Sequence, residues 1–291
     1  MTAAKKRCSM AYTAYIHPSQ PTAILFIIDK SSSMSGEMPL SAKSKAHVAA
    51  EVLNETLGEL IARCTRDDGV KDYLHIGILA YNGDGVKNVF QSGVKSNVLN
   101  LVSRIDCAHL RMDKRVEIYT TEAGESIERE LLFPVWIEPG ANGGAPMCRA
   151  ISRAKEVLAG WCSEYTYSFP PTVIHITGGI ATDGNPERLA EELKQIGTND
   201  GQVLSFNLHL CEQQAEAILY PASDSKLPNR YSEMLFRMSS VLPPSILDTL
   251  RYYRHSLPDG SRCFAYNADI TGVANFFDIG RAIPAGAIPD R

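Results

Sequence analysis

The sequence predicts an α/β protein with a doubly wound, mostly parallel central sheet, helices on both faces and an inserted β-hairpin. Two observations indicate this class. Short, continuously apolar runs alternate along the chain with longer segments whose apolar residues recur at helical spacing. A strand that is apolar throughout is typical of a parallel sheet covered on both faces, and strands that alternate with helices favour the same arrangement. We therefore expect a single domain over residues 22–291, after a polar lead-in at 1–21.

The strands are expected where β-branched and aliphatic residues follow one another without interruption. The clearest is TAILFIID at residues 22–29, which ends in Asp29. The turn GDG at 83–85 leads into an edge strand. The full set of expected strands comprises residues 22–29, 73–82, 86–91, 171–179, 202–211 and 261–269.

Helices are expected where apolar residues recur every three or four positions. The longest covers residues 39–64, and Ala46, Leu53 and Leu57 lie on its apolar face. A helix at 145–162 has a proline near its start, where the missing N–H is tolerated. The remaining helices are expected at residues 94–106, 185–197, 229–240, 244–255 and 270–280.

The segment from about residue 112 to 139 interrupts this alternation. Its two flanks are β-prone, and its centre, TEAGESIERE at 121–130, is charged and contains glycine. We interpret it as a hairpin inserted into the core at 22–212 and projecting from the sheet. A charged tip between Glu122 and Glu130 is typical of a solvated loop, and contact with a partner is the alternative. Residues 213–291 form a C-terminal helical and strand extension.

Composition restricts the classes of partner. The net charge of −4 and the lack of a basic stripe argue against a nucleic-acid binder. No apolar run reaches the roughly 18–20 residues that a transmembrane helix needs, and no apolar core of a signal peptide follows the basic start. The seven cysteines are scattered and form no CxxC pair, which favours reduced thiols. We therefore expect a cytoplasmic protein without nucleic-acid or membrane partners.

Polar side chains follow the first strand directly, in the stretch FIIDKSSSMSG. Asp29, Ser31 and Ser33 occupy alternate positions at the carboxyl end of that strand, where ligand sites of open α/β sheets collect. One carboxylate and two hydroxyls that converge there suit a hard cation such as Mg²⁺. The alternative is a polar turn, because serine and aspartate are favoured in turns and helix caps.

Three landmarks together resemble the von Willebrand factor A domain, also called the integrin I-type domain. They are FIIDKSSSMSG at 26–36, GGAPMCRAI at 143–151 and VIHITGGIATDG at 173–184, and their order and spacing agree over roughly residues 22–212. The resemblance implies a Rossmann-like fold with a metal-ion-dependent adhesion site. In that family a bound cation accepts a carboxylate from the protein partner.

This chain departs from the family's metal site at two positions. Ala145 stands where the family has a threonine, and Gly178 stands where it has an aspartate. The incomplete site implies low-affinity binding of Mg²⁺ or Mn²⁺, or none, because affinity for a dication depends on the number of anionic ligands. Asp183 could supply a substitute carboxylate, or it could cap the helix that begins near Asn185 or Pro186.

We therefore expect a non-enzymatic protein-binding module rather than an enzyme. There is no HExxH, Walker A, G-x-S-x-G or G-x-G-x-x-G motif, and three histidines lie within expected core strands, where packed histidines are common. The resemblance to bacterial cytoplasmic members implies an ATPase, kinase or phosphatase partner in a stress-response or signalling complex. Alternatives are a hydrolase or nucleotide-binding enzyme using Asp29, or a scaffold. Besides the metal site, the partner-binding face would include Ser32, Met34, Gly144, Ala145, Gly178 and Gly179.

Overall fold

A mostly parallel, eight-stranded sheet runs through the molecule in the computed structural model, which describes residues 11–39, 42–90, 97–120, 126–213, 215–253 and 256–267. Its neighbouring strands follow the order β13-β14-β12-β9-β1-β4-β5, and β6 also pairs with β4. The α/β class and the parallel centre of the sheet are thus confirmed. The parallel strands are β1 (Thr22–Asp29), β4 (Leu74–Asn82), β9 (Thr172–Thr177), β12 (Leu204–His209) and β14 (Phe264–Tyr266).

Short antiparallel strands complete the sheet. The expected edge strand after the GDG turn is β5 (Gly85–Asn88), which pairs antiparallel with β4. β6 (Asn100–Leu101) and β13 (Ile218–Leu219) pair antiparallel with β4 and β14. Neither β6 nor β13 was predicted from the sequence, because each strand is only two residues long and shows no hydrophobic periodicity.

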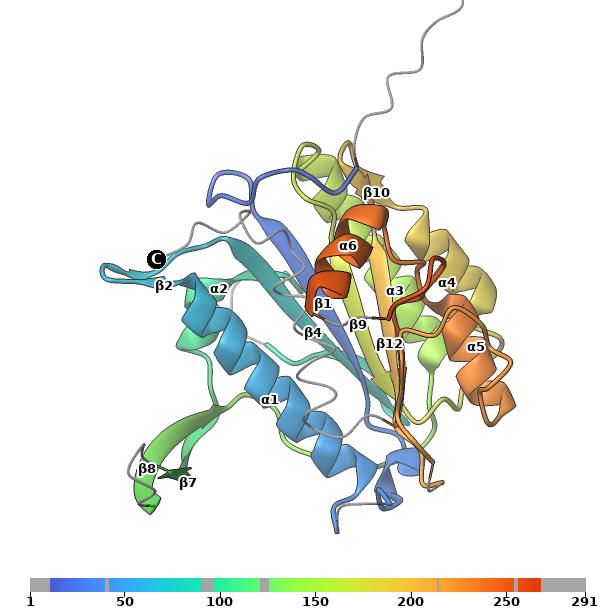
Figure 1. Cartoon of the computed structure of the whole chain (residues 1–291), viewed down its shortest axis with the longest axis horizontal. Coiled ribbons are helices and arrows are strands. Elements are labelled where there is room, and N and C mark those ends of the chain that lie inside the picture. Colours follow the sequence, from blue (N-terminus) through green and yellow to red (C-terminus); the bar gives the residue numbers. More distant parts are fainter. Residues whose placement is uncertain are drawn as a thin grey trace, which may run out of the picture.

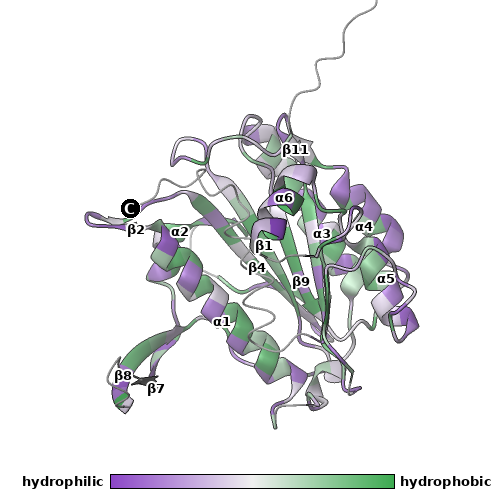
Figure 2. Ribbon diagram, viewed as in Figure 1, coloured by the Kyte–Doolittle hydropathy of each residue, from purple (hydrophilic) through white to green (hydrophobic). Residues whose placement is uncertain are grey.

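Helices cover both faces of the sheet (Figure 1). α1 (Lys45–Cys64), α2 (Val102–Asp106) and α6 (Pro244–Tyr253) pack on one face. α3 (Met147–Glu164), α4 (Glu187–Lys194) and α5 (Arg230–Met238) pack on the other. Figure 2 shows the hydrophobic strands between these layers, with hydrophilic residues on the outer sides of the helices.

β1 explains why the first apolar run has no polar position. Phe26 and the other even-numbered residues of its centre join the core beneath α1, whereas Leu25 and Ile27 join the core beneath α3. Successive side chains of a strand point to opposite faces, so a central strand with helices on both sides must be apolar throughout. The same burial places Asp29, the last residue of β1, only 1% exposed at the end of the sheet.

The inserted hairpin is formed by β7 (Arg111–Thr120) and β8 (Ser126–Val135), and it projects from the body of the molecule (Figure 1). Among the described residues, the Arg115 guanidinium lies over the Phe133 ring and pairs with Glu55 of α1 at 2.9 Å, and Arg111 pairs with Glu138 at the base of the hairpin. The hairpin prediction is confirmed for the described residues, which do not include 121–125 between the two strands.

Some expected elements differ in the structure. The helix expected at 94–106 is short, because β6 occupies Asn100–Leu101 before α2 begins. The described part of the lead-in, residues 11–21, is docked on the domain: Ile16 is fully buried, and the Tyr12 N–H donates to the carbonyl of Asp200. The helix expected at 270–280 lies outside the described residues. Two small ladders went unrecognised, namely β2 (Thr65–Arg66) with β3 (Gly69–Val70) and β10 (Gly197–Thr198) with β11 (Gly201–Gln202).

Two expectations about composition can be compared with the structure. Within the described ranges, no helix combines the length and apolar character needed to cross a bilayer. The six cysteines in this part of the chain are free thiols, and Cys64, Cys162 and Cys263 are buried among apolar residues.

Replacing residues 113–133 by a two-residue Asn-Gly turn tests whether the hairpin is an addition to the fold. The free energy of unfolding should change by less than about 1 kcal/mol, because the described residues of segment 113–133 form one partly exposed ion pair with the body, Arg115 with Glu55. Chemical denaturation of the shortened and full-length chains measures this. A loss of several kcal/mol would show that the hairpin is part of the folded core.

Candidate functional site

Three connections meet at the carboxyl end of β1. The short helix η1 (Ser32–Ser35) follows β1, and its Ser32 N–H donates to the carbonyl of Gly143 at 2.9 Å. The Asn142 N–H donates to the carbonyl of Lys30 at 2.8 Å, which fixes the segment before α3 beside β1. The third connection, after β9, joins them because the Thr182 N–H donates to the carbonyl of Ala145.

Asp29 is the fixed point of this arrangement. One carboxylate oxygen accepts from the Ser31 N–H at 2.8 Å, and the other accepts from the Thr177 hydroxyl at 2.8 Å. The first bond shapes the turn after β1, and the second joins β1 to β9. The hydroxyls of Ser31 and Ser33 lie 2.9 Å apart. The structure thus brings the three predicted oxygen-bearing residues together, with Asp29 and Ser31 each 1% exposed.

A chain of buried polar groups continues from Asp29 across the sheet. The Tyr81 hydroxyl lies 3.1 Å from the Thr177 hydroxyl and 2.9 Å from Nε2 of His175. Nδ1 of His175 lies 3.0 Å from Oδ1 of Asn207, and the Asn207 amide donates to Ser239. All these residues are 2% exposed or less. They come from β1, β4, β9 and β12 and from the end of α5, so the chain ties four neighbouring strands together.

The hydrogen bonds of this chain fix the form of the His175 ring. The Ser239 hydroxyl donates to the carbonyl of Leu235, so it accepts from the Asn207 amide. Asn207 therefore presents its oxygen to Nδ1 of His175, which must carry the proton. Burial lowers the pKa of His175 to about 4, with opposing contributions from Asn207 and the Asp29 carboxylate. A neutral ring leaves Nε2 unprotonated, so the single proton of the Tyr81 hydroxyl lies between two acceptors, Nε2 and the Thr177 hydroxyl oxygen.

His209 is a second buried histidine next to the site. Its Nε2 lies 3.2 Å from the carbonyl of Gly178 and donates to it, and its ring stands edge-on to Tyr266 with centroids 5.3 Å apart. Burial lowers the pKa of His209 to about 4. The expectation of packed, hydrogen-bonded histidines is confirmed for His175 and His209. The third, His75, is half-buried at the start of β4 and accepts from the Trp161 indole N–H.

Lys45 also lies at this site, although it was not predicted as a site residue from the sequence. It is the first residue of α1, its side chain is only 7% exposed, and its ammonium pairs with Glu212 at 2.8 Å. A Cβ built on Gly178 would lie 3.5 Å from the Lys45 nitrogen and 3.3 Å from the Ser33 hydroxyl. The ammonium therefore lies beside the position where the sequence resemblance implies that an aspartate is missing.

The predicted partner-binding face is only partly at the surface. Ser32 is exposed, and Gly144 and Gly178 are partly exposed. Met34 and Ala145 are buried, with Ala145 in the core beneath α3, so neither side chain can contact a partner. Gly179 is also buried; its φ of +87° favours glycine, and an added Cβ would lie 2.8 Å from Tyr231. The usable face is therefore smaller than expected.

Asp183 caps a helix, but not the one expected. Its carboxylate accepts from the N–H groups of Cys148 and Arg149 at 3.0 and 2.9 Å, at the start of α3. At the start of α4, it is the Asn185 side chain that accepts from the Glu187 N–H. Both Asp183 oxygens thus serve the N-terminus of α3, where a negative charge is favourable.

The residues present do not fit a dication at this position. The described part of the chain contains no group of three or more His, Cys, Asp and Glu side chains that could hold a metal ion. Both oxygens of Asp29 already accept hydrogen bonds, and Ala145 and Gly178 supply no side-chain oxygen. A buried ammonium beside Ser33 adds a positive charge where a dication would need anionic ligands.

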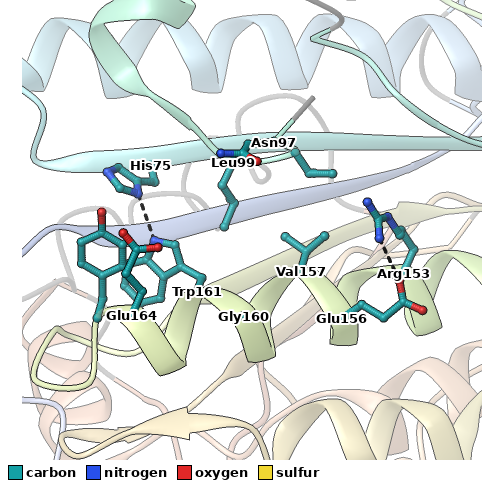
Figure 3. A pocket seen from close by; sticks show the side chains of 11 residues that line it. His75, Asn97, Leu99, Arg153, Glu156, Val157, Gly160, Trp161 and Glu164 are labelled. Atoms are coloured by element: carbon teal, nitrogen blue, oxygen red, sulfur yellow. Dashed lines mark hydrogen bonds and ion pairs between the residues drawn. The ribbon is translucent and has the colours of Figure 1, made fainter. Parts of the chain in front are cut away.

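A hollow of about 440 Å³ lies elsewhere, along α3 (Figure 3). Trp161 and Tyr165 stack at one end with ring centroids 4.8 Å apart, and Arg153 pairs with Glu156 at the other. None of the residues that line it belongs to the strand-end site. The candidate site is thus separate from this hollow.

Comparison with known proteins leaves the family open. No protein-family model matches the sequence, and a search of curated proteins finds no match. The crystal structure of the pilus adhesin SpaC from Lactobacillus rhamnosus GG matches with a TM-score of 0.49 and 12% identity, over 92% of this chain and 31% of that one. This chain thus spans less than a third of that adhesin. A likeness this distant identifies neither a family nor a function.

The buried histidines make stability depend on pH. Unfolding restores their ordinary pKa near 6.5, so the unfolded chain binds more protons than the folded chain between about pH 6.5 and 4. Stability should therefore fall as the pH drops through this window. Replacing His175 by Gln should reduce the fall between pH 7.5 and 4.5 by roughly 2–3 kcal/mol. Denaturation curves at several pH values measure this, and an unchanged fall in the variant would contradict a neutral buried ring.

Restoring the missing oxygens tests the role of Lys45. In a double variant with Ala145→Thr and Gly178→Asp, we expect the new carboxylate to pair with Lys45, so millimolar Mg²⁺ should not raise the melting temperature. Adding Lys45→Met should create Mg²⁺-dependent stabilisation, because an ion that binds only the folded state raises its stability. Adding Lys43→Met instead is the control. Equal stabilisation of the double and triple variants would contradict this expectation.

Proposed function

We propose that the chain is a non-enzymatic protein-binding module of the von Willebrand factor A type, which receives its partner at the carboxyl end of the sheet. The observation that carries the proposal is the convergence of the three sequence landmarks. Asp29, Ser31 and Ser33 meet at the end of β1, and the segments around Gly143 and Thr177 are hydrogen-bonded directly to that turn. Such a face at the carboxyl edge of an open α/β sheet is where ligands usually bind.

The form of the site favours a surface interaction over catalysis. Asp29, which the enzyme alternative requires, is 1% exposed and has both oxygens in hydrogen bonds. The exposed groups are Ser32 and, in part, Ser33, Gly144 and Gly178. These residues present hydroxyl and backbone groups at the surface, where they can form a small polar contact with a partner.

We further propose that partner binding is independent of a divalent cation. Bringing Mg²⁺ or Mn²⁺ next to the buried Lys45 ammonium would be unfavourable because like charges repel at short range in a poorly solvated site. An ATPase, kinase or phosphatase of a bacterial signalling complex remains the class of partner that the sequence resemblance suggests.

Site-directed photo-crosslinking in the native host tests the proposal. A photoreactive residue at Ser32 should give a discrete cross-linked species, and chelation by EDTA should not abolish it. The control position is Asp67, which is exposed in the turn between β2 and β3, at the far end of α1 (Figure 1). The same species from both positions, or none from Ser32, would contradict partner binding at this face.

A further inference from the structure

We propose that the Lys45 ammonium is the carboxylate-binding group of this face, and that Glu212 occupies it in the free protein as a displaceable internal ligand. The ligand class is the side-chain carboxylate of a glutamate or aspartate on an acidic partner segment. This inference rests on the proposed function, because it names the chemistry by which the same face would recognise its partner.

The burial of the two partners is unequal. The Lys45 side chain is 7% exposed, whereas that of Glu212 is 57% exposed. Within the described residues, Glu212 is the one side chain that forms a hydrogen bond or ion pair with this ammonium. An ammonium has three N–H donors and is costly to hold away from water without anionic partners. The lysine is thus held in place by the fold, and its anionic partner comes from the solvent side.

Two glycines make room for this pair. A Cβ built on Gly36 would lie 1.9 Å from a carboxylate oxygen of Glu212, so a side chain there would displace the carboxylate from its present position. A Cβ built on Gly178 would lie 3.5 Å from the Lys45 nitrogen. The backbone of Gly36, with φ −66° and ψ 149°, would suit other residues. Open space above the ammonium, rather than a backbone requirement, therefore accounts for glycine at position 36.

Glu212 reaches Lys45 from a segment that has few other ties to the site. It follows β12, which ends at His209, and Cys211 is held by a hydrogen bond from its N–H to Asn267. The Glu212 side chain makes one hydrogen bond, to Lys45. A partner's carboxylate can replace it by forming the same ion pair, and Glu212 is then released into solvent, where a carboxylate is well hydrated.

The ligand chemistry follows from the charges and donors at this point. The ammonium is a compact cation that favours a single anionic oxygen, and the Ser33 hydroxyl lies next to the same space. A carboxylate here would form a charge-assisted bond with the ammonium, and the Ser33 hydroxyl is the neutral donor near the same glycine. The face should thus prefer acidic segments and discriminate against basic ones.

Titration with N-acetyl-glutamate methylamide, a mimic of a glutamate side chain in a peptide, tests the inference by NMR of the lysine ε-methylene groups. In Glu212→Gln the Lys45 signals should shift with an apparent Kd about tenfold lower than in the unmodified chain, because an internal competitor reduces apparent affinity by the fraction of free sites. Glu216→Gln is the matched control, since Glu216 is exposed in the same segment, and it should leave the Kd unchanged.

The double variant with Lys45→Met and Glu212→Gln should lose the binding seen in Glu212→Gln, whereas Lys43→Met with Glu212→Gln should keep it. Absence of Lys45 shifts in Glu212→Gln, or the same Kd as in Glu216→Gln, would overturn the inference. The Glu212→Gln result stands on its own if the Lys45→Met chain fails to fold.

Photo-crosslinking at Ser32 in the Lys45→Met chain separates the two proposals. If the cross-linked species persists while the mimic fails to bind Glu212→Gln, partner binding stands and carboxylate recognition by Lys45 is wrong. If the mimic binds at Lys45 but Ser32 gives no cross-linked species in the unmodified chain, the proposed function is wrong and the carboxylate site stands.

Discussion

The pair of hydrogen bonds accepted by the Asp29 carboxylate holds the strand-end site together. One bond, from the Ser31 N–H, sets the direction of the chain as it leaves β1. The other, from the Thr177 hydroxyl, fixes the end of β1 to the end of β9 and so places Gly178 beside η1. Because the carboxylate is buried, its loss would leave unpaired donors and cost stability. The positions of Ser31 and Gly178 at this edge of the sheet follow from this constraint.

The buried polar chain behind Asp29 extends that constraint into the sheet. Tyr81, His175 and Asn207 connect strands that are otherwise joined by backbone ladders and apolar contacts. Such groups are favourable only when each finds a partner. A neutral His175 completes the chain from Asn207 to Tyr81, and protonation would add a charge that this part of the core does not solvate. The strand ends that carry the site are therefore held by a buried hydrogen-bonded chain, and the stability of that chain depends on pH.

The sequence allowed the sheet and the first part of the site to be predicted, for identifiable reasons. Uninterrupted apolar runs such as that of β1 follow from burial on both faces, and Asp29 with its serines is a local pattern. Lys45 and Glu212 could not be found in this way, because each looks like an ordinary surface charge and their pairing depends on a separation of 167 residues. Likewise, the capping of α3 by Asp183 depends on a contact over 35 residues that no local signal reports.

The central claim is that a lysine ammonium, rather than a dication, supplies the positive charge of this site. Paramagnetic broadening by Mn²⁺ in the NMR spectrum of the isotopically labelled, unmodified chain tests it most directly, because a bound Mn²⁺ broadens the amide signals around it. We predict no selective broadening of the Ser31, Ser33 and Gly178 amides at millimolar Mn²⁺. Selective and saturable loss of these three signals would show a metal bound among them and would contradict the claim.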